Sequence, residues 1–489
     1  MRIERRLGSS RRALILIALG ILWAPFAPSQ TNFVFFLADD LGWRDLGCYG
    51  SSFYETPNVD SLARSGMRFT QAYAACPVCS PTRASILTGK YPVRTGITDY
   101  INPEGANQPE RWLRRTNTRL LPARYRDRLA LEEVTFAEAL QQAGYATFFA
   151  GKWHLGPQGF WPEDQGFDVN KGGIEQGGPY GGNRYFSPYG NPRLEDGPPG
   201  EHLPDRLATE TVRFIETNRQ GPFLAYLAFY SVHTPLMARA DLEAKSAAKA
   251  KRIEFAGPRF LAEGVRETRQ VQDHAVFGGM VEAMDLAVGK VLDALTRLNL
   301  VENTVVIFMS DNGGLSTAEG SPTSNVPLRA GKGWMYEGGI REPMIIRAPR
   351  VTQAGSVSSE PVLSTDFYPT MLELAGLPAR PEQHLDGVSL APLLRGGTLE
   401  PRPLFWHYPH YGNQGGKPSG AIREGDWKLI EWYEDGRTEL FNLHQDLGEK
   451  YNLVRLHAEK AKELHGRLRA WRSQVDATLP ARNPFFMIE

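Results

Sequence analysis

The sequence has no excess of charge of either sign. Lysine plus arginine and aspartate plus glutamate each number 55 among 489 residues, and the formal net charge is zero. A balanced chain has no overall electrostatic attraction to nucleic acid or to an acidic surface. We therefore expect no nucleic-acid partner, and charge has to act through locally arranged side chains.

Long apolar runs are missing after the N-terminus. The run at the N-terminus covers residues 13–23, follows an arginine-rich start and precedes small residues and prolines. This order is typical of a secretory signal peptide, and the run is short for a membrane span of about 20 residues. We expect residues 1–29 to be removed on export by the Sec or the twin-arginine route. We then expect a periplasmic or secreted protein with no stable membrane span. The alternative is that the apolar run is retained as a membrane anchor.

Cysteine is scarce. The chain has three, and two of them, Cys76 and Cys79, lie in the stretch CPVCSPTR. A C-x-x-C pair occurs in redox couples and in zinc sites, whereas Cys79 read with Arg83 is a cysteine with a cation four residues away. These interpretations predict different enzymes, so other parts of the sequence have to decide between them.

Apolar segments alternate with amphipathic ones along the first 400 residues. Helices are expected over residues 136–143, ended by Gly144, and over residues 278–298. Strands are expected at residues 33–38 and 146–150, in a run that ends near His233 and in one that ends at Asp311. The alternation predicts an α/β fold with a large, mostly parallel sheet sandwiched by helices.

The pattern changes near Pro401. Short alternating strands follow, with a turn at Asp435-Gly436 that suits a hairpin, and then a charged helix over residues 456–475. A chain of this length also exceeds what one hydrophobic core usually supports. We expect a catalytic domain over residues 30–400 and a C-terminal subdomain over 401–489, which consists of a small antiparallel sheet and a terminal helix.

Oxygen-bearing side chains follow two of the predicted strands. Asp39 and Asp40 come after the first strand, and Asp311 and Asn312 after a later one. Adjacent buried carboxylates repel each other unless a cation lies beside them. Oxygen ligands favour calcium or magnesium over zinc, and ligands of parallel sheets bind beyond the carboxyl ends of the strands. The four residues predict a metal site; two separate capped turns are the alternative.

Basic side chains also gather at strand ends or in glycine-rich loops. They are Arg83, Lys152, His154, His233 and Lys332. Each alone is more often structural than catalytic. Together with a divalent cation they supply what a sulfate or phosphate ester needs, because the charge on its oxygens has to be neutralised as the ester bond breaks.

These clusters, in this order, resemble the type I sulfatases of the alkaline phosphatase superfamily. The matching pieces are NFVFFLADDLGW, CPVCSPTRASILTGKYP, GYATFFAGKWHLG, FLAYLAFYSVHTP, VVIFMSDNGG and GKGWMYEGGIREP, with DWKLI and ELFNL in the C-terminal subdomain. They cover nearly the whole mature chain, and C-x-P-x-R followed by ASILTG is a specific signature.

The resemblance implies that a separate maturation enzyme oxidises Cys79 to the aldehyde Cα-formylglycine. Pro81 and Arg83 complete the motif, whereas Thr82 stands where serine or alanine is commoner in the family. Cys76 has no part in this chemistry; it is either free or paired with Cys48. The resemblance also implies a calcium ion, with magnesium as the alternative, bound by Asp39, Asp40, residue 79, Asp311 and Asn312.

The resemblance further implies a mechanism. One hydroxyl of the hydrated aldehyde, deprotonated with help from Asp311, attacks sulfur and expels the alcohol. Lys332 and His233 hold the sulfate and protonate the departing oxygen. His154, near Lys152, takes the proton of the second hydroxyl so that sulfate is eliminated. Arg83 contacts the formylglycine side and balances the anionic ligands.

A sulfated carbohydrate is the expected substrate, because residues 177–189 and the stretch FWHYPHYGNQGG are rich in aromatic and amide groups that suit sugars. Small aryl sulfates are one alternative, and a phosphonate or phosphate ester hydrolase of the same superfamily is another. A thiol–disulfide protein built on Cys76 and Cys79 would leave the paired acids unexplained. A non-catalytic binding module would be expected to have lost some of the matched residues.

Overall fold

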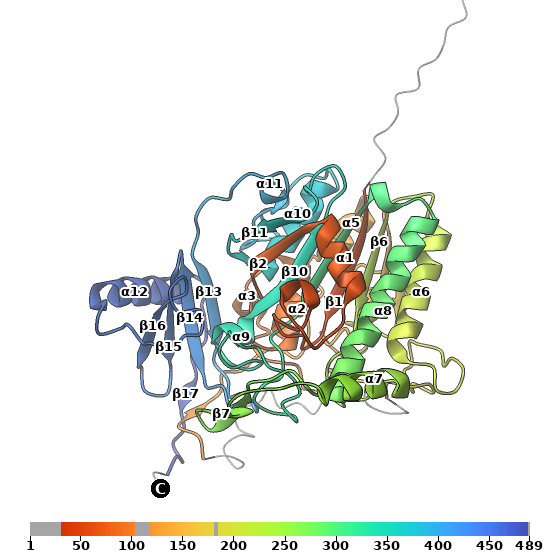
Figure 1. Ribbon diagram of the computed structural model, residues 1–489. Helices are drawn as coiled ribbons and strands as arrows, with labels where there is room; N and C mark the ends of the chain where they lie inside the picture. Colours follow the sequence, from red (N-terminus) through yellow and green to blue (C-terminus); the bar gives the residue numbers. More distant parts are fainter. Residues whose placement is uncertain (1–30, 103–116, 180–183, 488–489) are drawn as a thin grey trace, which may run out of the picture.

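The computed structural model describes residues 31–102, 117–179 and 184–487, so the signal peptide predicted over residues 1–29 lies outside the described residues. Figure 1 shows a large central sheet between helices and a smaller sheet beside it. The strands of the large sheet lie in the order β11 (Ser356–Ser358), β2 (Met67–Tyr73), β10 (Arg341–Arg347), β9 (Thr304–Ser310), β1 (Asn32–Ala38), β6 (Phe223–Ala228), β4 (Ala146–Gly151) and β5 (Val169–Lys171), and β12 (Val362–Leu363) also pairs with β2.

Most neighbours in this sheet run parallel. Strand β1 pairs in parallel with β6 and β9, and β4 pairs in parallel with β5 and β6. Strand β10 is the exception, because it is antiparallel to both β2 and β9. The predicted fold class, with its mostly parallel sheet, is confirmed.

Strand β1 shows why both faces of the sheet are covered. Side chains alternate along a strand, and Phe33 and Phe35 lie in one core whereas Val34 and Phe36 lie in another. The first core is closed by α2 (Cys79–Thr88), α5 (Phe136–Gln142), α10 (Phe367–Leu374) and α11 (Ala391–Leu394). The second is closed by α1 (Pro57–Ser65), α6 (Leu203–Asn218) and α8 (Ala275–Arg297), with α7 (Ala240–Ala250) packed on α8. A run of apolar residues without alternation is therefore what this strand requires.

The C-terminal part forms a four-stranded antiparallel sheet with a helix. Its elements are β13 (Leu404–Tyr408), β14 (Ser419–Glu424), β15 (Trp427–Trp432), β16 (Thr438–Asn442) and α12 (Ala458–Gln474). The sheet shares an apolar cluster with the main domain, in which Trp406 and Ile430 belong to the same core as Tyr73 and Trp334. This part is packed against the main domain, and the boundary near residue 400 stays a prediction.

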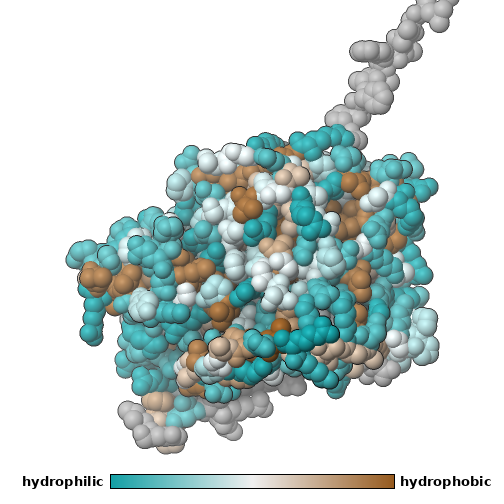
Figure 2. Space-filling model, viewed as in Figure 1, coloured by the Kyte–Doolittle hydropathy of each residue, from teal (hydrophilic) through white to brown (hydrophobic). Residues whose placement is uncertain are grey.

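The remaining elements are short and lie in the connections. They are the 3-10 helices η1 (Gly47–Tyr49), η2 (Pro162–Asp164), η3 (Val301–Asn303) and η4 (Ser364–Asp366), the helices α3 (Pro92–Thr95) and α9 (Glu337–Ile340), the hairpin of β7 (Phe260–Glu263) and β8 (Arg266–Arg269), and the pair β3 (Leu120–Leu121) and β17 (Ala481–Arg482). On the face drawn in Figure 2, hydrophilic residues predominate and hydrophobic ones form separate small groups. Among the described residues, no helix has both the length and the apolar composition needed to cross a membrane.

A buried ion-pair triad joins the C-terminal sheet to the main domain. The Lys428 Nζ atom lies 2.9 Å from a carboxylate oxygen of Glu337 and 2.9 Å from one of Glu449. All three side chains are fully buried. Removing the lysine would leave Glu449 without its ion-pair partner and Glu337 with Arg341 alone, 3.3 Å away, and breaking a buried ion pair usually costs far more than loss of a surface pair.

Lys428→Ala should therefore lower the free energy of unfolding by about 3–5 kcal/mol. Lys417→Ala provides the matched control, because Lys417 pairs with Glu434 at a partly exposed position and should cost no more than about 1 kcal/mol. Urea unfolding followed by tryptophan fluorescence measures both. Equal losses from the two substitutions would contradict the proposed role of the triad in joining the two parts.

Candidate active site

The carboxyl ends of adjacent strands bring the predicted acids together. Ala38, the last residue of β1, lies opposite Ser310, the last residue of β9. Asp39 and Asp40 follow the first strand and Asp311 follows the second, so parallel pairing brings the carboxylates to the same edge of the sheet. Asp311 also accepts a hydrogen bond of 3.2 Å from the Asp40 backbone N–H. The strand order thus accounts for a cluster that the sequence pattern predicted.

One predicted strand end is wrong. The sequence suggested a strand that ends near His233, but β6 ends at Ala228. Beyond it the chain leaves the β6 ladder and forms backbone hydrogen bonds with the segment after β1, from Asp39 N–H to Ser231 O and from Val232 N–H to Asp39 O. His233 therefore reaches the cluster from a loop. The sequence did not indicate this loop, because the apolar residues continue beyond the end of β6.

Each carboxylate of the cluster has a basic partner. Lys152 Nζ lies 2.7 Å from Asp39, and Lys332 Nζ lies 2.7 Å from Asp40. Arg83 donates from Nε to Asp311 at 2.8 Å, and its Nη1 donates to the Lys152 carbonyl. All of these side chains are buried. The structure brings together the acids and cations that the sequence analysis singled out.

Burial and charge act against each other in this cluster. Burial alone would lower the pKa of Lys332, but the charge of Asp40 and other neighbours outweighs it and raises this pKa well above the usual range. The pKa of Lys152 is raised in the same way by Asp39 against the effect of burial. Burial, only partly offset by Lys152, raises the pKa of Asp39 well above the usual range. Both lysines are consequently cationic, and a further positive charge beside Asp39 would stabilise its ionised form.

Helix α2 presents Cys79 and Arg83 on one face, because residues four apart lie one above the other on a helix. Pro81 stands in the first turn, where a missing N–H costs nothing. The unusual Thr82 is accommodated, since its hydroxyl donates to the Cys76 carbonyl at 3.1 Å. Burial raises the pKa of the Cys79 thiol to about 12, so the unmodified thiol is a poor nucleophile at neutral pH.

The other cysteines are free as well. Cys76 is buried, Cys48 is half-buried, and no disulfide joins them in the structure. Cys76 packs in the apolar cluster shared with the C-terminal sheet. A reactive redox thiol usually lies in electropositive, partly exposed surroundings, whereas Cys76 is buried among apolar side chains.

The two histidines have defined hydrogen bonds. The Nε2 atom of His154 lies 2.7 Å from the Ile101 carbonyl, which fixes a proton on Nε2 and leaves Nδ1, which has no hydrogen-bond partner among the described residues, as an acceptor. His233 Nδ1 lies 2.7 Å from the Thr234 carbonyl, and its Nε2 lies 3.8 Å from Asp40. Burial, and then the charge of Lys332, lower the pKa of His233 to about 3. Burial and Lys152 lower the pKa of His154 well below its usual range, so both rings are neutral at pH 7.

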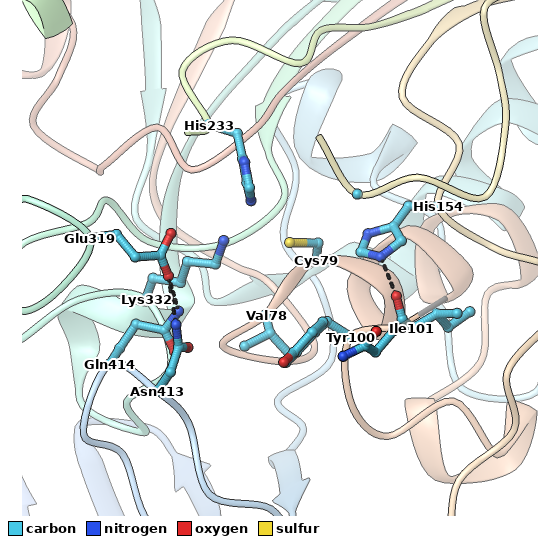
Figure 3. Close-up of a pocket in the computed structure, with 12 residues that line it drawn as sticks. Val78, Cys79, Tyr100, Ile101, His154, His233, Glu319, Lys332, Asn413 and Gln414 are labelled. Carbon is cyan, nitrogen blue, oxygen red and sulfur yellow. Dashed lines mark hydrogen bonds between the residues drawn. The ribbon is translucent and has the colours of Figure 1, made fainter. Parts of the chain in front are cut away.

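A cavity of about 300 Å³ opens onto this cluster. Figure 3 shows Cys79 near its centre, His154 on one side, Lys332 on the other and His233 above. Tyr100 and Ile101 also line it and belong to the stretch 99–128, which the sequence predicts to be a loop over the strand ends, whereas Glu319 was not predicted. Gly177, Asn413 and Gln414 come from the two loops predicted to contact substrate. Glu319 has no sequence signal beyond its place in a loop after β9.

The cluster fits a divalent cation. Ligand atoms of Asp39, Cys79 and Asp311 all lie within 4.8 Å of one another. Within the described part of the chain, Asp39 Oδ1 and Asn312 Oδ1 are buried oxygens without a hydrogen-bond partner, and buried polar atoms rarely stay unpaired. Asn312 Nδ2 also donates a hydrogen bond to Asp40 at 2.7 Å. The four predicted oxygen ligands, from Asp39, Asp40, Asp311 and Asn312, therefore lie in one cluster.

Comparison with known proteins decides the family. The family model described as Sulfatase matches residues 31–377, and the model for the C-terminal region of N-sulphoglucosamine sulphohydrolase matches residues 330–474. The chain belongs to the sulfatase family. Sulfatases are sulfuric ester hydrolases, so the predicted enzyme class is confirmed.

Similar sulfatases match over most of their length. A sulfatase of Formosa agariphila is 34% identical over 93% of this chain and 93% of its own. The N-acetylgalactosamine-6-sulfatase of Rattus norvegicus is 33% identical over 91% of this chain and 80% of its own. Arylsulfatase A of Homo sapiens is 33% identical over 92% and 87%.

Solved structures agree with this assignment. The structure of Ps i-CgsB in complex with k-i-k-neocarrahexaose has a TM-score of 0.74 and 29% identity over 94% of this chain and 95% of that one. A phosphonate monoester hydrolase of Agrobacterium radiobacter has a TM-score of 0.61 at 20% identity over 91% of this sulfatase and 96% of its own chain, which is a likeness of fold alone. The alternative of a phosphonate hydrolase thus has weaker support than a sulfatase.

Proposed function

We propose that this sulfatase hydrolyses a sulfate ester of a carbohydrate, with Cα-formylglycine at position 79 and a bound divalent cation, for which calcium is the first candidate. The position of Cys79 carries the proposal: it lies at the cavity with Lys332, His154 and His233 around it, and with Asp39 and Asp311 behind it. An oxygen on residue 79 would lie between the residues that bind the metal and the basic side chains that bind the sulfate.

A divalent cation held by Asp39, Asp40, Asp311 and Asn312 would polarise the oxygens of residue 79 and of the sulfate. It would also balance the charge. The three aspartates and the cations Arg83, Lys152 and Lys332 cancel formally, and both histidines are neutral. Without the cation, an anionic sulfate ester would enter a buried site whose positive side chains are already paired with the aspartates.

Formylglycine, as its hydrate, would supply one hydroxyl to attack sulfur and a second whose deprotonation lets the sulfate leave. Asp311, held by Arg83, has a carboxylate oxygen within 4.8 Å of the Cys79 sulfur, which makes it the candidate to accept the first proton. The unpaired Nδ1 of His154 suits it to accept the second, since Ile101 keeps the proton on Nε2. Lys332 carries a proton for the departing oxygen in the free protein, and His233 lies beside it to orient the sulfate.

The relatives and the cavity walls support a carbohydrate substrate. Relatives at about one-third identity include N-acetylgalactosamine-6-sulfatases, and the structure of Ps i-CgsB contains a neocarrahexaose. Tyr100, Asn413 and Gln414 at the cavity offer a ring and amide groups for sugar hydroxyls. Small aryl sulfates, as in the name of arylsulfatase A, remain the second candidate.

Export belongs to the proposal too. The basic, apolar and small-residue order of residues 1–29 supports removal of a signal peptide and a periplasmic or secreted location. The division into a catalytic part before residue 400 and a C-terminal subdomain after it is proposed on the separate four-stranded sheet. A formylglycine-generating enzyme is the one protein partner that the chemistry requires.

A substrate panel tests the carbohydrate proposal. The matured protein is assayed with N-acetylgalactosamine 6-sulfate, a carrageenan oligosaccharide, 4-nitrophenyl sulfate and a phenylphosphonate monoester. We expect the highest kcat/KM for a sulfated saccharide and the lowest for the phosphonate. A preference for 4-nitrophenyl sulfate with no saccharide turnover would favour the aryl sulfate candidate instead.

The sulfate-binding role of Lys332 gives a separate prediction. Lys332→Ala should lower kcat/KM about 10²–10³-fold, because a preorganised charge at the reacting group is lost. Lys462→Ala, at an exposed position of α12, is the control and should change little. Steady-state assays with 4-nitrophenyl sulfate measure both. A Lys332→Ala rate near the wild-type value would remove this lysine from the mechanism.

A further inference from the structure

A carboxylate stands in the wall of this sulfate-binding cavity, although it opposes the binding of an anion. Glu319 lines the cavity together with Lys332 and His233. Figure 3 shows it with Gln414 and Asn413 on the side away from His154. A negative charge repels the sulfate itself. Glu319 is therefore expected to contact a part of the substrate other than the sulfate group.

The side chain of Glu319 is held in place by neutral donors. Its Oε1 atom accepts hydrogen bonds from Asn413 Nδ2 at 2.9 Å and from Gln414 Nε2 at 2.8 Å. Its Oε2 atom accepts one from the Thr234 hydroxyl at 3.3 Å. In the part of the chain that the structure describes, no basic side chain forms an ion pair with it. The carboxylate is therefore fixed by neutral donors, while Lys332, the lysine of the same cavity, forms its ion pair with Asp40 instead.

The backbone conformation of Glu319 also indicates that its position is specifically fixed. Glu319 has a φ of 54°, in the left-handed region that non-glycine residues seldom adopt. Gly320 follows at 88° and Ser321 at 42°. Such conformations persist where the surroundings fix them, and they concentrate at functional sites. Here the turn brings the carboxylate to the cavity between the main domain and the loop that carries Asn413 and Gln414.

We infer that Glu319 is a specificity-determining residue that selects the charge beside the sulfate ester. Its carboxylate accepts a hydrogen bond from a hydroxyl of a singly sulfated sugar. It repels a second sulfate or a carboxylate at that position. The neighbouring amides of Asn413 and Gln414 hold this carboxylate without an ion pair among the described residues, so its charge can act on the substrate in a partly buried cavity. This inference rests on the proposed sulfatase function.

Competition against 4-nitrophenyl sulfate tests the inference without requiring turnover of the sugar. The inhibition constants of N-acetylgalactosamine 6-sulfate and N-acetylgalactosamine 4,6-disulfate are measured for the wild type, Glu319→Gln and Glu319→Ala. The wild type should bind the monosulfated sugar more tightly. Both variants should shift the ratio of the two constants about tenfold or more towards the disulfated sugar, because a like charge is removed.

Glu459→Gln, at an exposed position of α12, makes the same change in net charge and should leave the ratio unchanged. An unchanged ratio in Glu319→Gln, or a shift in Glu319→Ala alone, would overturn the inference, since size rather than charge would then be responsible. Failure of both sugars to compete would overturn it as well. Failure of the wild type to hydrolyse any sulfate ester would instead contradict the proposed function.

Discussion

Replacing Cys79 by alanine should lower sulfatase kcat/KM by at least about 10³-fold, because the proposed nucleophile and one proposed metal-ligand position are lost. Cys76→Ser should stay within about threefold of the wild type, since the proposed mechanism gives that thiol no part in the reaction. Both residues are buried and only three positions apart, so the pair separates chemistry from local packing. Steady-state kinetics with 4-nitrophenyl sulfate and thermal melting of the same samples measure the two effects.

The redox interpretation predicts a different result. A C-x-x-C couple needs both thiols, so its activity would be lost equally from either substitution. Cys79→Ala should also melt close to the wild type, because Cβ and the helix position are kept. Equal kinetic losses from Cys76→Ser and Cys79→Ala would contradict the sulfatase mechanism, provided that both variants remain folded.

Removal of the metal should have an effect of similar size. Treatment with a chelator, or the substitutions Asp39→Asn and Asp311→Asn, should lower activity by about three orders of magnitude, because a bound cation contributes several kcal/mol to charge stabilisation in the transition state. Adding back Ca²⁺ should restore the chelated wild type but neither variant. Elemental analysis gives the metal content of each sample.

Metal binding has a readout besides activity. A cation that binds the folded state raises the melting temperature with its concentration, and this shift should be present in the wild type and small in Asp39→Asn. Asp435→Asn, at an exposed hairpin turn, is the control and should behave as the wild type. Full activity after complete removal of metal would contradict the metal site, and a preference for Mg²⁺ over Ca²⁺ would correct the ion.

The strand-end residues of the site could be predicted because their signal is local. The apolar run of β1 ends at Ala38, and Asp39 follows it directly. The same holds for β9 and Asp311. Parallel pairing then needs no further information to bring these residues together. The motif C-x-P-x-R is equally local, since one helix carries both Cys79 and Arg83.

Other features depend on contacts that the sequence does not display. His233 lies on a loop held by backbone bonds to Asp39, so its distance from the end of β6 could not be read from an apolar run. Glu319 reaches the cavity through a left-handed backbone conformation, and its partners Asn413 and Gln414 lie in the C-terminal part. The triad around Lys428 likewise joins residues far apart in the chain.

The mass of residue 79 in active enzyme shows directly whether formylglycine is present. The protein is produced with a formylglycine-generating enzyme, and the tryptic peptide of residues 69–83 is fragmented from a sample of known specific activity. We predict that residue 79 has exchanged one sulfur and two hydrogen atoms for one oxygen, that it reacts with a carbonyl probe, and that Cys76 is unchanged. An unmodified thiol at position 79 in fully active enzyme would contradict catalysis by formylglycine.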